Sequence, residues 1–494
     1  MIRRFSVQKL NYLSLTNEIW CIGCGKRLND MLRMYRNEVF VEKISVLMDN
    51  NCKLWGVWKQ TGRKEVAVCG TNIIKEKGNK HVLLIITSDN YMAIYKEIAK
   101  DIKARKMISC LYPVYYRILT KTIMNICCHF PLKRQLLFYA GKEPHENADA
   151  IVQYLKNEYQ GKKYRIVYLT DKEEKEAGII YLNKKSICCK SSVWQVIRYC
   201  WFYSKSAFLF YENEYLAKVR SDQKLIYLNH GTIPLKKVSD VLKQPRQVDY
   251  ALCPSRGCAK LYNAQYGIPI EKQLYIMPPR VWFLFQKKHV LYNWINRKKK
   301  QVIIWLPTFR RLKGTQRTDS FLVNPFPLLT EEDGFQKVDK TLEKNNQLLL
   351  IKKHPREKGD LKIPDFCKNI VSITEETLQK KGLLLQEVLG ETAALITDYS
   401  GIVFEYMLLK RPICYVITDM KEYFRGFAVD HPFDYMPGVK VQTLSELLNF
   451  LESVRLGMDE YQKERNNLIK QLFGENRYKN GAKELIAALD NIRK

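Results

Sequence analysis

The sequence predicts an α/β protein with parallel sheets, built as a small N-terminal α/β domain followed by two successive larger ones. Three observations predict it. Short apolar runs typical of buried strands recur along the chain and alternate with helical patterns. Small, polar or histidine residues follow several of these runs directly, as they do at the carboxyl ends of parallel strands. At 494 residues, the chain is also too long for a single hydrophobic core.

Residues 1–107 are predicted to form a small Rossmann-like domain. Its glycine pair, Gly23 and Gly25, is only a fragment of the dinucleotide-binding pattern G-x-G-x-x-G, because Leu28 stands where the third glycine would fall. A structural or interaction role is therefore favoured over cofactor binding. The predicted elements are strands Ile19–Ile22, Ile44–Met48 and Val82–Thr87, and a helix over Arg27–Glu38.

The cysteines indicate a reduced, cytosolic protein. The sequence has 14 scattered cysteines, and its two adjacent pairs, Cys127-Cys128 and Cys188-Cys189, suit no ordinary disulfide framework. No signal peptide is visible after Met1. Cys21 and Cys24 form a C-x-x-C pair without a second pair or nearby histidines, which favours buried structural cysteines over a zinc site.

Residues 108–134 are predicted to connect the first domain to the second. No apolar run reaches the roughly 18 residues that a membrane span needs. The stretch Ile108–Pro131 fits either a membrane-interfacial helix or a buried connecting helix, and both interpretations stay open. A second aromatic helix, predicted over Ser192–Ser204, carries Trp194, Arg198, Trp201 and Tyr203. Packing is the default explanation for these aromatics, with membrane contact as the alternative.

Residues 135–285 and 286–494 are predicted to be two α/β domains facing each other across a cleft, joined by a basic linker over Gln286–Lys300. The second domain is predicted to contain strands Leu136–Tyr139, Tyr164–Leu169, Gly178–Leu182, Ala207–Tyr211, Leu225–Leu228 and Tyr250–Cys253, and a helix over Asn147–Tyr159. The third is predicted to contain strands Val302–Leu306, Leu348–Ile351, Ile370–Ile373, Leu395–Thr397 and Ile413–Val416, with helices over Leu378–Gly390, Ile402–Leu409, Leu444–Arg455 and Lys479–Arg493.

His230 follows the predicted strand Leu225–Leu228 and is a candidate catalytic base. The near-neutral pKa of histidine suits the deprotonation of an attacking hydroxyl group, and the end of a parallel strand faces the ligand crevice. Gly231 leaves the backbone approachable, and Thr232 adds a hydroxyl group. A histidine bonded within a turn is the plain alternative.

Two further strand ends carry cations. Thr308 and Arg310 follow the strand Val302–Leu306, and an arginine there offers two parallel hydrogen bonds to a phosphate, although an ordinary surface arginine is the simpler interpretation of that string alone. His354 follows Leu348–Ile351, and its candidate phosphate-binding neighbours are Lys352 and Arg356.

The strand Leu395–Thr397 runs into a turn suited to an anion. Thr397, Ser400 and Gly401 supply hydroxyl groups and backbone N–H groups just before a helix. Asp398 does not suit a phosphate and is expected to position loop donors or a ligand hydroxyl. Glu405, one turn into the helix, could reach a sugar hydroxyl or could equally be a solvated helix residue.

The net charge points to an anionic partner. The chain has 82 Lys and Arg against 51 Asp and Glu, a formal charge of +31, which attracts nucleic acid, an anionic membrane or a phosphate-rich polymer. The sequence has no D-x-D motif for a metal-bound diphosphate and no G-x-x-x-x-G-K-[ST] phosphate loop. Arginine, lysine and backbone donors are therefore expected to neutralise a diphosphate without a metal or cofactor.

Together these strings resemble the CDP-glycerol glycerophosphotransferase family of teichoic acid and capsule polymer synthesis. The family pattern is H-G-T-P-L-K, P-T-[FW]-R, a lysine-flanked H-P, and [LI]-[IV]-[TS]-D-Y-S-S followed by F-[DE]. This chain matches it in order over about residues 135–475. It departs twice, because Ile233 lengthens the first string by one residue and Gly401 replaces the second serine. The matching strings are His230–Lys236, Pro307–Arg310, His354-Pro355, Thr397–Gly401 and Phe404-Glu405.

The resemblance implies a GT-B-like pair of Rossmann-type domains with a metal-independent site between them. It implies that an acceptor hydroxyl attacks the β-phosphate of CDP-glycerol and releases CMP. His230 is then the base, and the developing charge on the phosphate is stabilised by His354, Arg310 and Ser400. The implied acceptor is a lipid-linked glycan or a polyol-phosphate polymer, at the cytoplasmic face of the membrane and held there peripherally.

Three alternatives remain open. The donor could be CDP-ribitol with the same chemistry. The protein could instead be a GT-B glycosyltransferase or epimerase that uses a UDP-sugar. A basic nucleic-acid-binding protein is the non-enzyme alternative, but no compact basic and aromatic module of a known type is visible, so nucleic acid is not expected as a partner.

Overall fold

The computed structural model describes residues 2–4, 10–11, 13–35, 38–62, 64–76, 82–88, 91–104, 108–111, 114–140, 146–157, 164–170, 178–183, 193–212, 215–229, 231–239, 248–286, 289, 291, 301–308, 310, 319–320, 324, 326–354, 362–474 and 480–492. The chain divides into two compact units. The first contains residues 1–133, 169–175 and 181–206, and the second contains residues 134–168, 176–180 and 207–494.

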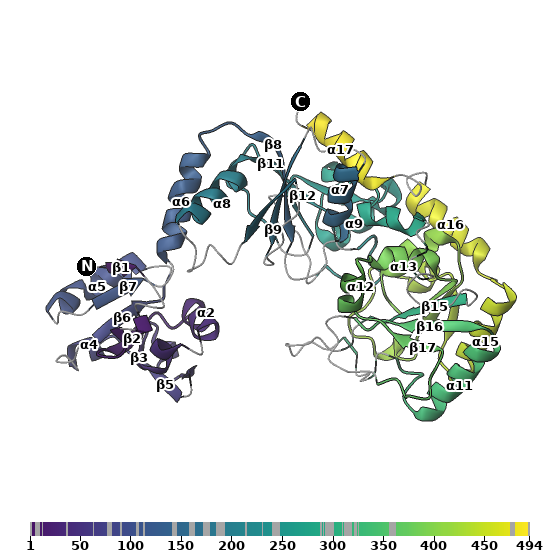
Figure 1. The fold of residues 1–494 in the computed structure, drawn as a ribbon, viewed down its shortest axis with the longest axis horizontal. Coiled ribbons are helices and arrows are strands. Elements are labelled where there is room, and N and C mark those ends of the chain that lie inside the picture. Colours follow the sequence, from purple (N-terminus) through teal and green to yellow (C-terminus); the bar gives the residue numbers. More distant parts are fainter. Residues whose placement is uncertain are drawn as a thin grey trace. The chain divides into compact units, whose positions relative to one another are not determined.

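The first unit is built on a sheet with the order β1-β7-β6-β2-β3-β5-β4 (Figure 1). Its central order, β5-β3-β2-β6-β7, is that of a Rossmann sheet. Strands are added on one side of β2 first and then, from β6 on, on its other side. The strands are β1 (Ile2–Arg4), β2 (Glu18–Ile22), β3 (Ile44–Met48), β4 (Trp58–Thr61), β5 (Lys64–Cys69), β6 (Val82–Ile86) and β7 (Ile108–Leu111).

Two parts of this sheet differ from the sequence prediction. β4 and β5 form an antiparallel hairpin at the sheet edge. β4 carries no apolar run, and the apolar run of β5, Val66–Cys69, is only partly buried. Ile108–Leu111 was assigned to the helical connector but pairs with β6 and β1 as a parallel strand. The start of the connector is therefore part of the first sheet.

The helices of this unit are α2 (Lys26–Met34), α3 (Val39–Glu42), α4 (Ile73–Glu76), α5 (Tyr91–Ala104), α6 (Val114–Cys127) and α8 (Val193–Lys205), with the short 3-10 turn η1 (Cys52–Leu54). α2 ends at Met34, so the predicted helix to Glu38 was too long. α6 and α8 lie side by side (Figure 1) and pack through Cys127, Val196 and Cys200. Cys21 and Cys24 are buried, as structural cysteines are.

Two further sheets lie mainly in the second unit. The first of them has the order β10-β9-β8-β11-β12-β13-β14 and, with its helices, forms what we call the middle lobe. Its strands are β8 (Lys133–Ala140), β9 (Arg165–Thr170), β10 (Ile179–Asn183), β11 (Ser206–Tyr211), β12 (Lys224–Tyr227), β13 (Tyr250–Cys253) and β14 (Gln273–Tyr275). Its helices are α7 (Glu146–Asn157) and α9 (Ala259–Tyr266), with 3-10 segments η3 (Arg256–Cys258), η4 (Ile270–Lys272) and η5 (Pro279–Phe285).

The other sheet, with the order β17-β16-β15-β18-β19-β20, is parallel throughout and forms the C-terminal lobe. α11 and α15 lie side by side on it (Figure 1), and their apolar stripes complete its core. The strands are β15 (Gln301–Leu306), β16 (Gln347–Ile351), β17 (Ile370–Ser372), β18 (Ala394–Thr397), β19 (Ile413–Val416) and β20 (Val439–Val441). The helices are α11 (Glu332–Lys344), α12 (Glu375–Lys381), α13 (Leu385–Glu391), α14 (Ile402–Tyr406), α15 (Leu444–Leu456), α16 (Gln462–Phe473) and α17 (Gly481–Ile492), with 3-10 turns η6 (Met407–Leu409), η7 (Met420–Glu422) and η8 (Pro432–Tyr435).

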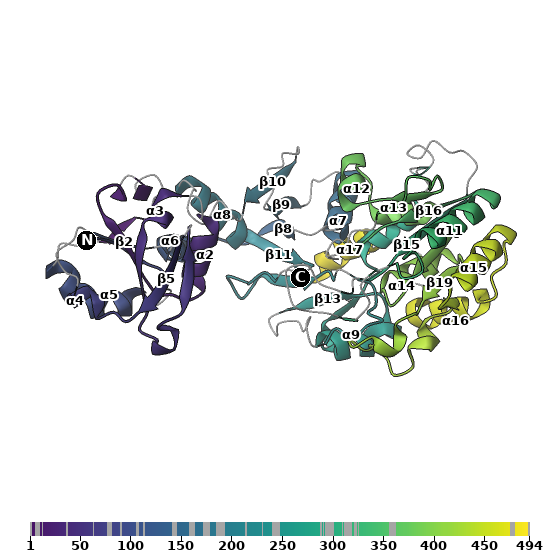
Figure 2. The ribbon, with the colours of Figure 1, turned by 90° about the horizontal axis from the view of Figure 1, so that it is seen from below.

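The predicted helix over Leu378–Gly390 is two helices, α12 and α13. Gly382 separates them with a φ of +64°, a left-handed conformation that ends a helix. At the C-terminus, α17 packs against α7 and η5 of the middle lobe, and Figures 1 and 2 both show it beside α7. Tyr164 in that lobe donates a hydrogen bond to Asp490 at 2.6 Å. The last helix therefore packs on the middle lobe, although it follows the C-terminal lobe in sequence.

The predicted fold class, a GT-B-like pair of Rossmann-type lobes preceded by a small Rossmann-like domain, is confirmed by these three sheets. Within the described ranges, no helix has both the length and the apolar character needed to cross a membrane.

Candidate functional site

Three of the strings that the sequence analysis singled out meet at one edge of the C-terminal lobe. β15 lies between β16 and β18, and the three strands are parallel. Their carboxyl ends are level, because Trp305 pairs with Ile351 and Leu306 pairs with Thr397. The residues that follow these strands are Thr308 and Arg310, Lys352 and His354, and residues 398–401. Parallel α/β sheets bind their ligands at this edge.

The fourth string lies in the middle lobe, after β12. Gly231 is partly exposed, and Thr232 is buried. His230 and Arg356 lie outside the described residues, so their proposed roles remain predictions from the sequence.

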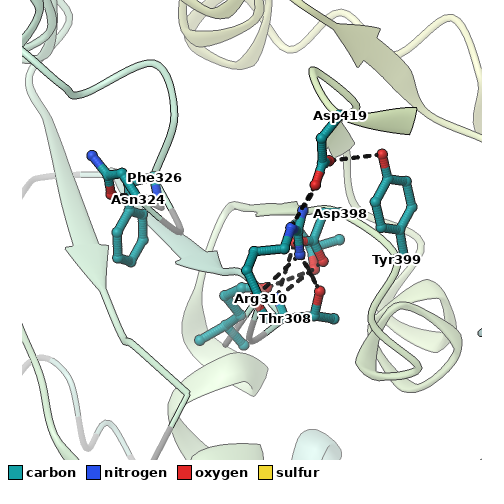
Figure 3. Close-up of polar contacts among 9 residues, drawn as sticks. Thr308, Arg310, Asn324, Phe326, Asp398, Tyr399 and Asp419 are labelled. Atoms are coloured by element: carbon teal, nitrogen blue, oxygen red, sulfur yellow. Dashed lines mark hydrogen bonds and ion pairs between the residues drawn. The ribbon is translucent and has the colours of Figure 1, made fainter. Parts of the chain in front are cut away.

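Arg310 is buried between two carboxylates (Figure 3). Its Nε atom donates to Asp419 Oδ2 and its Nη1 atom donates to Asp398 Oδ2, both at 2.7 Å. Burial alone would lower the pKa of Arg310, but the charges of Asp398 and Asp419 raise it above its ordinary value. Only 2% of the residue is exposed, so the interpretation of an ordinary surface arginine was wrong. Its guanidinium holds two carboxylates here, and its contact with a phosphate stays a prediction.

Asp398 joins the turn after β18 to the loop after β15. Both of its carboxylate oxygens accept from the backbone N–H of Thr308, each at 3.0 Å, and Oδ2 also accepts from the Thr308 hydroxyl at 3.1 Å. Thr397 makes a parallel link, because its hydroxyl donates to the Leu306 carbonyl at 2.7 Å. These are the contacts expected of residues that position a loop.

Asp419 is a site residue that the sequence analysis missed. It accepts from Arg310 and from the hydroxyl of the buried Tyr399, the latter at 3.0 Å (Figure 3). Burial raises the pKa of its carboxyl group, but the Arg310 charge outweighs burial and lowers it below the ordinary value. The signal was present, since Asp419 is a polar residue shortly after the apolar run Ile413–Val416.

Thr232 and Glu405 meet in the interior between the two lobes. The Thr232 hydroxyl donates to Glu405 Oε1 at 2.6 Å, and both residues are fully buried. Glu405 also accepts from Arg280 Nε at 3.2 Å and from Gln386 Nε2 at 3.4 Å. The solvated alternative for Glu405 was therefore wrong. Protein N–H and O–H groups occupy the Glu405 carboxylate in this structure. The contact of Thr232 and Glu405 with the nucleotide substrate stays a prediction.

Lys352 and His354 stand at the end of β16. Lys352 is buried, and its ammonium group lies 3.2 Å from Glu375 Oε2 of α12. His354 is partly exposed, as a residue at the mouth of a crevice would be. Ser400 is partly exposed as well, and its hydroxyl oxygen lies 3.5 Å from the N–H of Ile402.

Gly401, which replaces the second serine of the family pattern, is explained by close packing. A Cβ atom there would lie 2.7 Å from the carbonyl oxygen of Ile233. The φ of Gly401 is an ordinary −65°, so backbone conformation does not require glycine. Ile233 is the residue that lengthens the first family string. The two departures therefore meet in space, and the added residue leaves no room for a side chain at position 401.

Gly401→Ala is expected to lower the free energy of unfolding by about 1–3 kcal/mol, because the added methyl group must displace backbone. Urea unfolding would measure this. Gly25→Ala is the steric control, since a Cβ atom there meets nothing within 4 Å, and its unfolding midpoint should fall less than that of Gly401→Ala. Deleting Ile233 from the Gly401→Ala variant should recover part of the loss. An unchanged midpoint in Gly401→Ala would contradict this explanation.

Known proteins are similar to this chain in sequence and fold. A teichoic acid poly(ribitol-phosphate) polymerase of Bacillus spizizenii is 26% identical over 317 residues, which cover 58% of this chain and 48% of the relative. The teichoic acid ribitol-phosphate polymerase TarL of Staphylococcus aureus is 23% identical over 425 residues, 79% of this chain and 69% of the relative. The chain thus spans about half the length of the first relative and about two thirds of the second.

A solved structure of the wall teichoic acid polymerase TagF matches with a TM-score of 0.59 at 17% identity, covering 82% of this chain and 98% of that chain. This likeness shows a shared fold. The family model described as CDP-glycerol:poly(glycerophosphate) glycerophosphotransferase matches residues 122–486, which contain both lobes and all four strings. Since that match takes in well over half of the sequence, the chain belongs to the CDP-glycerol:poly(glycerophosphate) glycerophosphotransferase family.

Proposed function

We propose that the protein transfers glycerol phosphate from CDP-glycerol to a hydroxyl group of a membrane-linked glycan or of a growing polyol-phosphate polymer, and releases CMP, in the synthesis of a teichoic acid or capsule-type polymer. The observation that carries the proposal is the meeting of three family strings at the carboxyl edge of one sheet. The fourth string is joined to the same lobe by the hydrogen bond between Thr232 and Glu405.

In the proposed reaction, the oxygen of the acceptor hydroxyl attacks the β-phosphorus of CDP-glycerol. The bond from this phosphorus to the oxygen that bridges the two phosphates breaks, and CMP leaves with that oxygen. His230 accepts the hydroxyl proton as the base. The negative charge that develops on the phosphates is stabilised, in this proposal, by His354, Arg310 and Ser400. Positioning and electrostatic stabilisation supply most of the rate enhancement in phosphoryl transfer.

The remaining predicted site residues have supporting roles in this proposal. Gly231 leaves room for substrate beside the base, and Gly401 with its neighbouring N–H groups faces the phosphates. The predicted cations at the mouth of β16, Lys352 and Arg356, add positive charge near the diphosphate.

CDP-ribitol is the second candidate donor, because two of the relatives named above are ribitol-phosphate polymerases. A panel of CDP-glycerol, CDP-ribitol and UDP-sugars, each supplied with a membrane fraction as acceptor, would separate the candidates. We expect CMP release from one or both CDP-polyols. Turnover of a UDP-sugar with no turnover of either CDP-polyol would contradict the proposal in favour of a glycosyltransferase or epimerase.

A lipid-linked acceptor requires contact with a membrane, and we place that contact on helices α6 and α8 of the first unit. Three large apolar side chains are exposed on these helices and just after α6: Ile126 at 58%, Phe130 at 44% and Trp194 at 78%. Packing explains Tyr203, which is buried, but it does not explain Trp194. Arg198 is also exposed on α8, so apolar and cationic groups occur together, as at a peripheral anionic-membrane surface on the cytoplasmic side.

Trp194→Ser is expected to lower binding to vesicles that contain phosphatidylglycerol by about tenfold, because an indole buried in the interface contributes roughly 1.5–3 kcal/mol. Co-flotation of the purified protein with vesicles would measure it. Trp55→Ser, at a 49% exposed tryptophan outside α6 and α8, is the matched control and should bind like the wild type. Equal binding of Trp194→Ser and wild type would contradict the proposal that α8 contacts the membrane.

A further inference from the structure

A closed ring of hydrogen bonds joins residues on both sides of position 230, the position of the proposed base. Asn229 donates from Nδ2 to the Tyr262 hydroxyl at 3.0 Å, and that hydroxyl donates to the Thr232 carbonyl. The Thr232 hydroxyl donates to Glu405 at 2.6 Å. The ring thus fixes the chain immediately before and shortly after position 230.

The other half of the ring returns from Glu405 to Asn229. Arg280 donates from Nε to Glu405 at 3.2 Å, and its backbone N–H donates to Asn147 Oδ1 at 3.1 Å. Asn147 Nδ2 then donates to the Asn229 carbonyl at 2.7 Å. Five ring members come from the middle lobe, and Glu405 comes from α14 of the C-terminal lobe.

Asn229 holds an uncommon backbone conformation within this ring. Its φ is +61°, a left-handed value that is unusual for a residue other than glycine. Its Oδ1 atom accepts from the Tyr227 hydroxyl at 3.1 Å and from the Gly231 N–H at 3.3 Å, so every polar group of its side chain is used. Backbone strain at a site persists only where the surroundings over-determine it. The hydrogen bonds of the ring hold Asn229 in this conformation.

The ring is buried, and its hydrogen bonds keep their directions. Asn147, Asn229, Thr232, Tyr262 and Glu405 are fully buried, and Arg280 is 6% exposed. Burial raises the pKa of Tyr262 well above its ordinary value, so its hydroxyl stays protonated and continues to donate to Thr232. A buried network with every member satisfied specifies one geometry, because a lost hydrogen bond is costly there.

We propose that four residues of the ring position His230 for the transfer reaction and couple it to Glu405 on helix α14 of the C-terminal lobe. These positioning residues are Asn147, Asn229, Tyr262 and Arg280. This inference rests on the proposed function. The coupling means that the base is aligned when the two lobes are joined through Glu405. Because the residues act through His230 and do not contact substrate, their loss lowers kcat and leaves the KM for CDP-glycerol nearly unchanged.

Tyr262→Phe tests the proposal, since it removes one hydroxyl group of the hydrogen-bond ring and keeps the aromatic side chain. We expect kcat for CMP release to fall about 10- to 100-fold, the size of effect that a small misplacement of a catalytic group produces, with KM changed less than about threefold. Tyr168→Phe is the control, because it removes a partly buried tyrosine hydroxyl of the same lobe, outside the ring, that donates to Asp149 at 2.5 Å. It should leave kcat unchanged.

Asn147→Asp is the second variant. It keeps the side-chain volume and the acceptor for the Arg280 N–H but removes the donor to Asn229, so kcat should fall in the same way. In a double-mutant cycle, Tyr262→Phe combined with Glu405→Gln should lose less than the product of the two single losses, since both open the same ring.

The outcomes separate the two claims. Wild-type turnover with unchanged kcat in Tyr262→Phe and Asn147→Asp would overturn the positioning role alone, as would multiplicative effects in the cycle. A similar loss of kcat in Tyr168→Phe would also overturn it, because the effect would then follow general stability. Absence of CMP release by the folded wild type would overturn the proposed function and this inference with it.

Discussion

His230→Ala is expected to lower kcat for CMP release by about 10²- to 10⁴-fold, the contribution typical of a general base. The KM for CDP-glycerol should change little, because the proton transfer occurs in the transition state and not in the bound ground state. Initial rates at varied CDP-glycerol concentration, with a membrane fraction as acceptor, would measure both constants.

His129→Ala is the matched control for this experiment. His129 is an exposed histidine of the first unit whose ring bonds the Asn125 carbonyl at 2.9 Å, so its loss should leave kcat unchanged. Full activity of His230→Ala would show that another group removes the proton, and the proposed mechanism would then be wrong.

Arg310→Met is expected to lower the free energy of unfolding by about 3–5 kcal/mol, the usual cost of removing one partner from a buried ion pair. The guanidinium separates Asp398 from Asp419, and the three side chains are 2–3% exposed. Without it, two buried carboxylates would face each other uncompensated. Urea unfolding would measure the loss, and Arg310→Lys should fall between wild type and Arg310→Met because it keeps the charge but not the fork.

Arg455→Met is the surface control for this series. Arg455 pairs with Glu452 on the exposed face of α15, where solvent screens the pair, so its unfolding midpoint should not move measurably. If Arg310→Met unfolded at the same urea concentration as the wild type, the cluster would not hold the loops after β15, β18 and β19 together.

Most of the fold could be predicted from the sequence, because buried parallel strands are short apolar runs. β6, β16, β18 and β19 were found in this way, close to their observed limits. β4 was missed because it carries no such run, whereas the short apolar run of β5, Val66–Cys69, was overlooked. Helices α11 and α16 were also missed, since their apolar residues are spread among many charged ones and become evident only from the face each helix buries.

The candidate site was predictable only where it lies at the end of a strand. Thr308, Lys352 and Ser400 were found because each follows an apolar run. Arg280 and Asn147 follow no motif, and their role depends on partners more than 100 residues away, such as Glu405 for Arg280. The burial of Arg310 was also beyond the sequence, because it depends on Asp419 of a different strand end.

The structural reason for Gly401 shows a similar limit. The sequence identifies two departures from the family pattern, at Ile233 and Gly401, as separate facts. Only the fold brings the Ile233 carbonyl next to Gly401 and makes the second departure a consequence of the first.

The most direct test of the proposed function is CMP release by the purified wild-type protein from CDP-glycerol or CDP-ribitol, with a membrane fraction as acceptor. We predict that CMP appears together with an equal amount of polyol phosphate bound to the membrane fraction. No CMP from either donor, with folded protein and membranes present, would contradict the proposal that this family member is a polyol-phosphate transferase.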